Sequence, residues 1–89
     1  MYKLISIKIV KDNQLELKIR DNNGNIHSLL YDFDKGIISN NIPYGLKRFV
    51  NAVIEIINFT TLRDFIISQH KNIIDFINCK TIRLLSTLP

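Results

Sequence analysis

The sequence predicts an α+β fold: an antiparallel β-meander of three to four strands over residues 1–39, followed by two helices over residues 43–89 that pack on one sheet face. Two patterns support this prediction. Apolar and polar residues alternate with a period of two near the N-terminus, which is typical of half-buried strands. Beyond residue 45, apolar residues recur at helical spacing. At 89 residues, the chain has the size of a single domain with one core.

The first two predicted strands show the clearest alternation. In the first strand, residues 4–10, the odd positions Ile5, Ile7 and Ile9 are apolar and β-branched. The second strand, residues 15–20 (LELKIR), alternates without an exception. We therefore expect the apolar positions to face a core and the polar positions to face water.

Turn-forming residues separate these strands from those that follow. Asn23 and Gly24 suit the positive φ angles of a tight hairpin. A third strand is predicted from Ile26 to Phe33. After a turn at residues 34–36, a short fourth strand is expected at residues 37–39.

The first helix is predicted from Leu46 to Phe59, after a turn at residues 43–45. Four polar residues recur at helical spacing and define one water-facing stripe. These residues are Lys47, Asn51, Glu55 and Asn58.

The second helix is predicted to begin at Thr61, an N-cap residue that is followed three residues later by Asp64. Its apolar arc contains Leu62, Phe65, Ile66, Ile73, Phe76 and Ile77, and it is widened by Ile67 and Ile74. The pattern is compatible with a helix that ends near Asn78 and with one that continues towards the C-terminus.

Both apolar arcs are wider than one sheet face requires. One explanation is that the helices contact the sheet and each other, and the other is that part of the arc binds a partner. On the second explanation we expect a two-fold homodimer through Ile67 and Ile74.

The residue types argue against catalysis and against a bound metal or cofactor. One cysteine and two histidines in separate elements cannot supply a zinc site without carboxylates. Cys79 and His70 are about 13 Å apart along a continuous helix, too far for a nucleophile and its base. Glu16 and Lys18 have the acid-x-lysine spacing of some metal-dependent nucleases, but alternating surface charge explains the pair more simply. We predict no catalytic residues, no metal and no cofactor.

Composition indicates the kind of protein. The single cysteine excludes an intramolecular disulfide, and charged residues interrupt every apolar run, so we expect a cytoplasmic protein that does not enter a membrane. Abundant isoleucine, asparagine and lysine are a bias of AT-rich genomes, such as those of low-GC bacteria and their phages or plasmids.

Two sets of basic residues are candidate binding groups. On the water-facing side of the sheet, Lys8, Lys18 and Arg20 could present a basic surface with Tyr2 available for stacking. In the first turn of the first helix, Lys47 and Arg48 stand where acids are favoured, and would complement an arriving phosphate or carboxylate. For both sets the alternative is a solvated charged surface without a ligand, and Glu16 interrupts the basic surface of the sheet.

The sequence favours a small non-enzymatic interaction protein, namely a phage- or plasmid-encoded inhibitor or accessory factor that binds and occludes a host protein or nucleoprotein complex. The first alternative is a regulator that binds nucleic acid through its basic surface. The second is a metal-dependent nuclease-like enzyme, for which Glu16 and Lys18 are the candidates.

Overall fold

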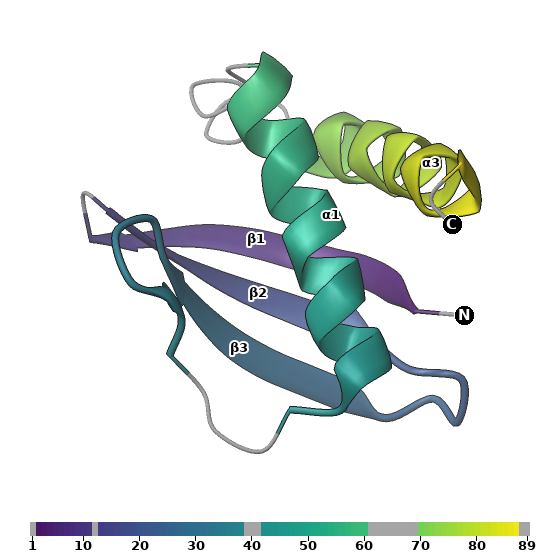
Figure 1. Ribbon diagram of the computed structural model, residues 1–89, viewed down its shortest axis with the longest axis horizontal. Coiled ribbons are helices and arrows are strands. Elements are labelled where there is room, and N and C mark those ends of the chain that lie inside the picture. The colour runs from purple at the N-terminus through teal and green to yellow at the C-terminus, as the bar shows by residue number, and fades with distance from the viewer. Residues whose placement is uncertain (1, 12, 39–41, 61–69, 88–89) are drawn as a thin grey trace. The chain divides into compact units, whose positions relative to one another are not determined.

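The computed structural model describes residues 2–11, 13–38, 42–60 and 70–87. It confirms the α+β fold, because a four-stranded antiparallel sheet comes first and helices follow it (Figure 1). The chain divides into two compact units. Met1–Ile42 contains the strands, and Pro43–Pro89 contains the helices.

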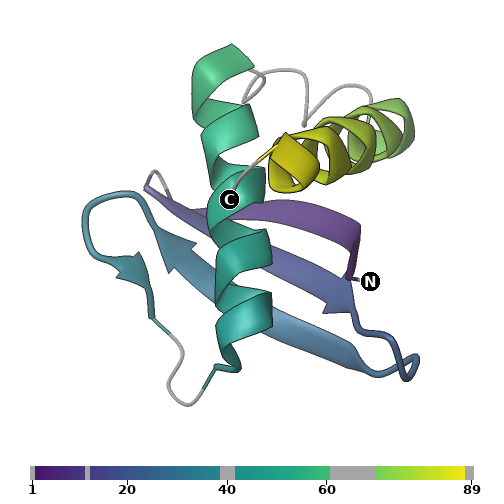
Figure 2. The ribbon, with the colours of Figure 1, turned by 45° about the vertical axis from the view of Figure 1, so that its right-hand side comes forward.

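The sheet of the first unit is a meander with the strand order β1-β2-β3-β4, so each strand pairs with its neighbour in sequence (Figures 1 and 2). The strands are β1 (Lys3–Lys11), β2 (Gln14–Arg20), β3 (Ile26–Asp32) and β4 (Gly36–Ile37). A fourth strand is present as predicted, with Tyr31 paired to Ile37 and Asp32 to Gly36. It begins one residue earlier than predicted, Ile38 lies beyond its end, and Ser39 lies outside the described residues.

Two irregularities in β1 change the alternation predicted for that strand. Leu4 pairs with Ile19 and Ser6 pairs with Lys18, so Ile5 is an extra residue without a partner in β2. A second register shift falls between Ile9 and Lys11. At each such bulge, two residues of one strand oppose one residue of the other, and the inward and outward positions exchange parity.

The expectation that Ile5 faces the core is therefore wrong, because Leu4 takes that place. Leu4 is fully buried, whereas Ile5 is half-buried. The strictly alternating β2 follows the prediction throughout. The buried apolar residues on this face of the sheet are Leu4, Ile7, Leu15, Leu17, Ile19 and Leu29.

Helix α1 (Tyr44–Thr60) begins two residues earlier than predicted. Tyr44 and Gly45 belong to its first turn, and the Lys47 N–H donates to the Pro43 carbonyl at 3.0 Å. The apolar residues buried along α1 are Leu46, Phe49, Val50, Ala52, Val53, Ile54 and Ile57. The predicted polar stripe is confirmed where it is described, since Lys47, Asn51 and Glu55 are all exposed.

Helix α3 (His70–Thr87) contacts α1 and continues well past Asn78, so the longer of the two predicted helices is observed. The predicted start at Thr61 and Asp64 lies outside the described residues. Ile74, Ile77, Asn78 and Thr81 form the buried stripe of α3.

The prediction that Phe76 belongs to the apolar arc of this helix is wrong. Phe76 is 40% exposed, and the Lys80 ammonium lies 5.6 Å from its ring centroid. Two polar side chains, Asn78 and Thr81, occupy the buried stripe further along the helix.

Candidate functional site

Strand pairing brings polar side chains from three strands to one face of the sheet. Residues that are directly opposite in an antiparallel pair share a face, and so do alternate residues of one strand. We call this surface the polar face. It consists of Lys3, Ser6, Lys8 and Lys11 of β1, of Gln14, Glu16, Lys18 and Arg20 of β2, and of Ile26, Ser28, Leu30 and Asp32 of β3.

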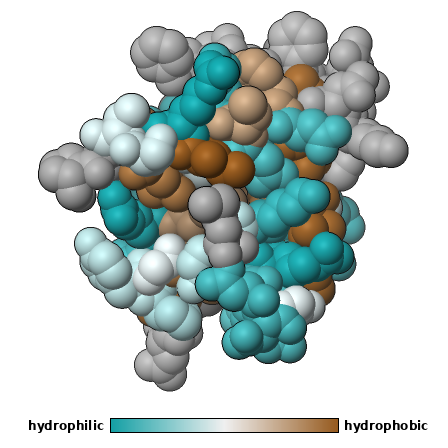
Figure 3. All heavy atoms as spheres, turned by 90° about the vertical axis from the view of Figure 1, so that its right-hand side faces the viewer, coloured by the Kyte–Doolittle hydropathy of each residue, from teal (hydrophilic) through white to brown (hydrophobic). Residues whose placement is uncertain are grey.

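The polar face carries a surplus of positive charge. Its five cations, all exposed, are Lys3, Lys8, Lys11, Lys18 and Arg20. Among the residues that the structure describes, the one salt-bridge contact is between His27 and Asp21, so none of the five cations forms an ion pair with a described acid. Where Figure 3 shows the surface, hydrophilic side chains form extended areas between hydrophobic ones.

The two acids of the polar face offset two of its five positive charges and leave a surplus of three. Glu16 pairs in register with Lys8 and Leu30, without forming an ion pair. Asp32 is buried, and both oxygens of its carboxylate accept hydrogen bonds from neighbouring groups. Its Oδ2 accepts from the Gln14 side chain at 2.9 Å, and its Oδ1 accepts from the backbone N–H groups of Asp34 and Lys35 at 2.8 and 3.1 Å.

These hydrogen bonds hold the carboxyl group of Asp32 in its charged form. The contact from Gln14 is the largest cause of its lowered pKa, and the Asp34 N–H adds to it. Asp32 therefore secures the turn after β3, and it fixes the Gln14 amide to the protein itself.

Like charges lie side by side at one end of the polar face. Lys3 and Arg20 are directly opposite each other on β1 and β2, and Lys18 lies two residues from Arg20 on the same face. Like charges placed directly opposite across a sheet are destabilising. A bound anion would relieve this repulsion, so the arrangement favours a negatively charged ligand at this end.

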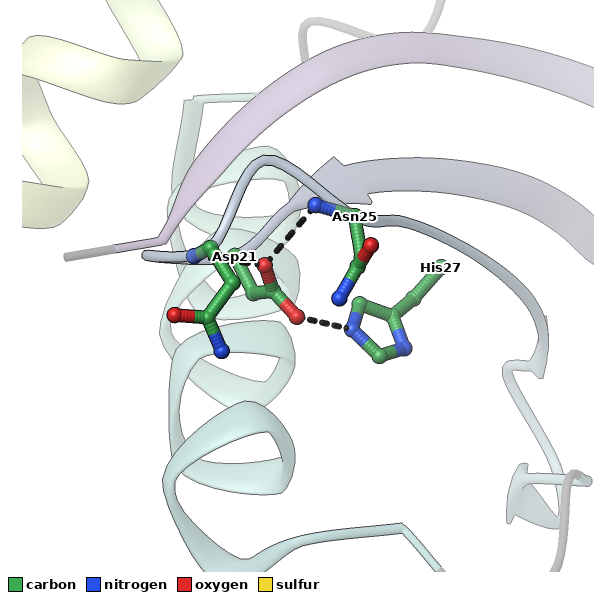
Figure 4. Close-up of polar contacts among 4 residues, drawn as sticks. Asp21, Asn25 and His27 are labelled. Atoms are coloured by element: carbon green, nitrogen blue, oxygen red, sulfur yellow. Dashed lines mark hydrogen bonds and ion pairs between the residues drawn. The ribbon is translucent and has the colours of Figure 1, made fainter.

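The loop between β2 and β3, next to Arg20, is held by Asp21 (Figure 4). Its Oδ1 accepts from the backbone N–H groups of Asn23 and Asn25, both at 2.9 Å, and its Oδ2 lies 2.8 Å from Nε2 of His27. The His27 contact is the largest cause that lowers the pKa of Asp21.

Gly24 provides the left-handed backbone conformation of this loop, with a φ of 86°. The predicted positive φ is thus observed, but in a five-residue loop over residues 21–25 rather than in a tight two-residue turn. Together, Asp21 and Gly24 hold the end of the polar face in a defined shape.

The other predicted cations, Lys47 and Arg48, lie on α1. They line a shallow hollow of about 220 Å³ together with Tyr44, Asn51, Ala52 and Glu55. These six residues follow the helical spacing of one face. Tyr44 is 80% exposed, and the first turn of α1 contains no acid.

The structure separates the remaining predicted residues. Tyr2 precedes β1 and lies outside the ladder that aligns Lys8, Lys18 and Arg20. Ile74 is 7% exposed, which leaves little of its side chain for a second copy, and Ile67 lies outside the described residues. The dimer stays a prediction.

Sequence reasoning missed two of the five cations of the polar face, Lys3 and Lys11. Both have odd numbers, so a regular strand would place them with Ile7 and Ile9 on the apolar face. The two bulges turn them outward, and the identical apolar character of Leu4 and Ile5 hides the first bulge from any alternation pattern.

Within the described residues, no group of three or more His, Cys, Asp or Glu side chains could hold a metal ion. Cys79 is free and exposed. Among the helices of this same part of the chain, none has the length and apolar character needed to cross a membrane. Comparisons with protein-family models, with curated proteins and with solved structures find no match.

Proposed function

We propose that this chain is a non-enzymatic binding protein that holds nucleic acid against the polar face of its sheet. The observation that carries the proposal is the set of five exposed cations on one face, without an ion pair to any described acid. Lysine and arginine that neutralise phosphates release condensed counterions, and this release is a large source of affinity for nucleic acid.

The composition of the polar face favours nucleic acid over a protein partner. Protein interfaces are depleted of lysine and enriched in aromatic residues, whereas interfaces with nucleic acid are far more positively charged. Four of the five cations here are lysines. The described polar face has no aromatic residue, and its two apolar members, Ile26 and Leu30, are on β3.

Binding without chemistry is favoured by the surroundings of Glu16. The nuclease-like reading of Glu16 and Lys18 needs a second acid on a neighbouring strand to share a metal. The residues directly opposite Glu16 are Lys8 and Leu30, and neither is an acid. The acid diagonal to Glu16 on β3 is Asp32, whose oxygens already accept hydrogen bonds within the turn and from Gln14.

The test is the salt dependence of binding to a labelled nucleic acid, followed by fluorescence anisotropy. Lys18→Gln, in the centre of the polar face, should weaken binding and reduce the slope of log K against log salt by about 0.9. The control Lys80→Gln removes the same charge from α3 and should leave the slope unchanged. Absence of binding at low salt, or equal effects of the two changes, would refute the proposal.

A second candidate function is supported by the hollow on α1. Tyr and Arg are the residues most enriched at the centres of protein interfaces, and Tyr44 and Arg48 lie one helical turn apart beside Lys47. This arrangement suits an acidic segment of a partner protein. Such a partner would fit the interaction protein that the sequence favours, including an inhibitor of a host complex.

A further inference from the structure

We infer that the polar face binds duplex DNA through its phosphates, with little preference for sequence. The inference rests on the proposed function and names the form of nucleic acid that this face accepts. Three features of the face carry it: the absence of a stacking group, the kind of cations present, and their distribution in two dimensions.

The described polar face has no aromatic side chain on which unpaired bases could stack. Proteins that bind single strands combine a positive groove with aromatic side chains, and stacking contributes about 1–3 kcal/mol per base. The aromatic residues of this part of the sheet, Tyr31 and Phe33, contact each other with centroids 5.4 Å apart. Tyr31 pairs in register with Leu15 on the opposite, buried face. A single strand would therefore gain charge contacts without aromatic stacking.

The side chains of the polar face are suited to phosphates rather than to base edges. Base readout depends on planar groups that make two hydrogen bonds, namely Arg to guanine and Asn or Gln to adenine. Gln14 already donates one N–H to Asp32 at 2.9 Å, so the orientation of its amide is set by Asp32 and not by a base. Arg20 is the one remaining planar group among the five cations, and lysines bind phosphate as point charges.

The distribution of charge fits a duplex better than one strand. The cations extend along β1 from Lys3 to Lys11 and also across to β2. Because Lys3 and Lys11 pair with Arg20 and Gln14, their separation is six steps of β2, about 20 Å at 3.3 Å per residue. A duplex presents one phosphate charge per about 1.7 Å of its axis, twice the density of one of its strands. Modules for duplex RNA reach across two minor grooves over about 16 base pairs. The polar face is too short for that, so we assign it to DNA.

The experiment uses the full-length protein and fluorescence anisotropy with four probes at equal salt. Two are 16-base-pair DNA duplexes of unrelated sequence, the third is one of their single strands, and the fourth is an RNA duplex of the same sequence. We expect both DNA duplexes to bind within about three-fold of each other. They should bind at least about five-fold more tightly than the other probes. With up to five phosphates neutralised, the slope of log K against log salt should approach about −4.5.

The outcomes separate this inference from the proposed function. Tighter binding of the single strand or of the RNA duplex, still weakened by Lys18→Gln and not by Lys80→Gln, would overturn the inference and keep the proposed function. A difference above ten-fold between the two DNA sequences would overturn the lack of sequence preference. Failure of all four probes to bind at low salt would overturn both.

Discussion

Leu17 and Lys18 are adjacent in the middle strand, and the structure predicts opposite consequences for their replacement. Leu17 is fully buried, and its neighbours across the ladder, Ile7 and Leu29, are 3% and 6% exposed. A leucine packed on both sides leaves a cavity that cannot collapse easily, so Leu17→Ala should cost about 3–5 kcal/mol, the upper part of the usual range. Lys18 is exposed, and Lys18→Ala should change the free energy of unfolding by less than about 0.5 kcal/mol.

The assay is urea unfolding followed by far-UV circular dichroism. With an m value of about 1.5 kcal/mol per molar urea, Leu17→Ala should lower the midpoint by about 2–3 M, and Lys18→Ala by less than about 0.4 M. For DNA binding the order reverses, since Lys18→Ala removes a phosphate contact from a stably folded protein. If Lys18→Ala destabilised the protein more than Leu17→Ala, the two faces of β2 would be exchanged and the polar face would not exist as described.

Three further predictions concern other parts of the molecule. Thr81 is fully buried and its Oγ1 has no hydrogen-bond partner among the described residues. The isosteric change Thr81→Val should therefore raise the free energy of unfolding by about 1 kcal/mol in thermal unfolding, and a lower melting temperature would show that the hydroxyl makes a stabilising hydrogen bond. The pKa of Asp21 lies below its ordinary value of 3.8, chiefly through His27, so Asp21 stabilises the fold above about pH 4, and this contribution is lost as the pH falls through the lowered value. Asp21→Asn should therefore flatten the acid side of a curve of unfolding free energy against pH, and an unchanged curve would contradict this. The double change Lys47→Glu, Arg48→Glu should leave the isolated fold intact, because acids are favourable at the start of a helix. It should abolish capture of an acidic partner protein and leave DNA binding by the sheet unchanged, and full capture of that partner by the double variant would exclude the α1 hollow as its binding site.

The elements that could be predicted from the sequence are those in which one local rule is sufficient. In β2 every second residue is apolar and no register shift occurs, so Leu15, Leu17 and Ile19 are buried as expected. For α1, helical spacing predicted the exposure of Lys47 and Glu55. In each case the pattern continues without interruption through the element, so only one face of the element can be buried.

The phase of α3 could not be predicted in this way. Hydropathy alone places Phe76 inside and Thr81 outside, yet Phe76 is 40% exposed and Thr81 fully buried. A helix of 18 residues buries whichever stripe its neighbours touch, and Ile74, Ile77 and Thr81 are on one stripe at spacings of three and four. The Lys80 ammonium 5.6 Å from the Phe76 ring provides an alternative contact for the exposed aromatic.

The candidate site depends on the two bulges of β1, which no local pattern in the sequence predicts. In an uninterrupted strand, Lys3 and Lys11 would share a face with Ile7 and Ile9, and the opposite face would keep Lys8 as the one cation from β1. One extra residue near each end of the strand reverses the alternation there, so that both lysines join Lys8 and the apolar face receives Leu4 in place of Lys3. The same two shifts thus complete the apolar face and concentrate charge on the polar face. The burial of Leu4 is a sufficient packing reason for the first bulge, whereas the placement of Lys3 directly opposite Arg20 that accompanies it is unfavourable in the free protein and is the part that a bound anion would offset.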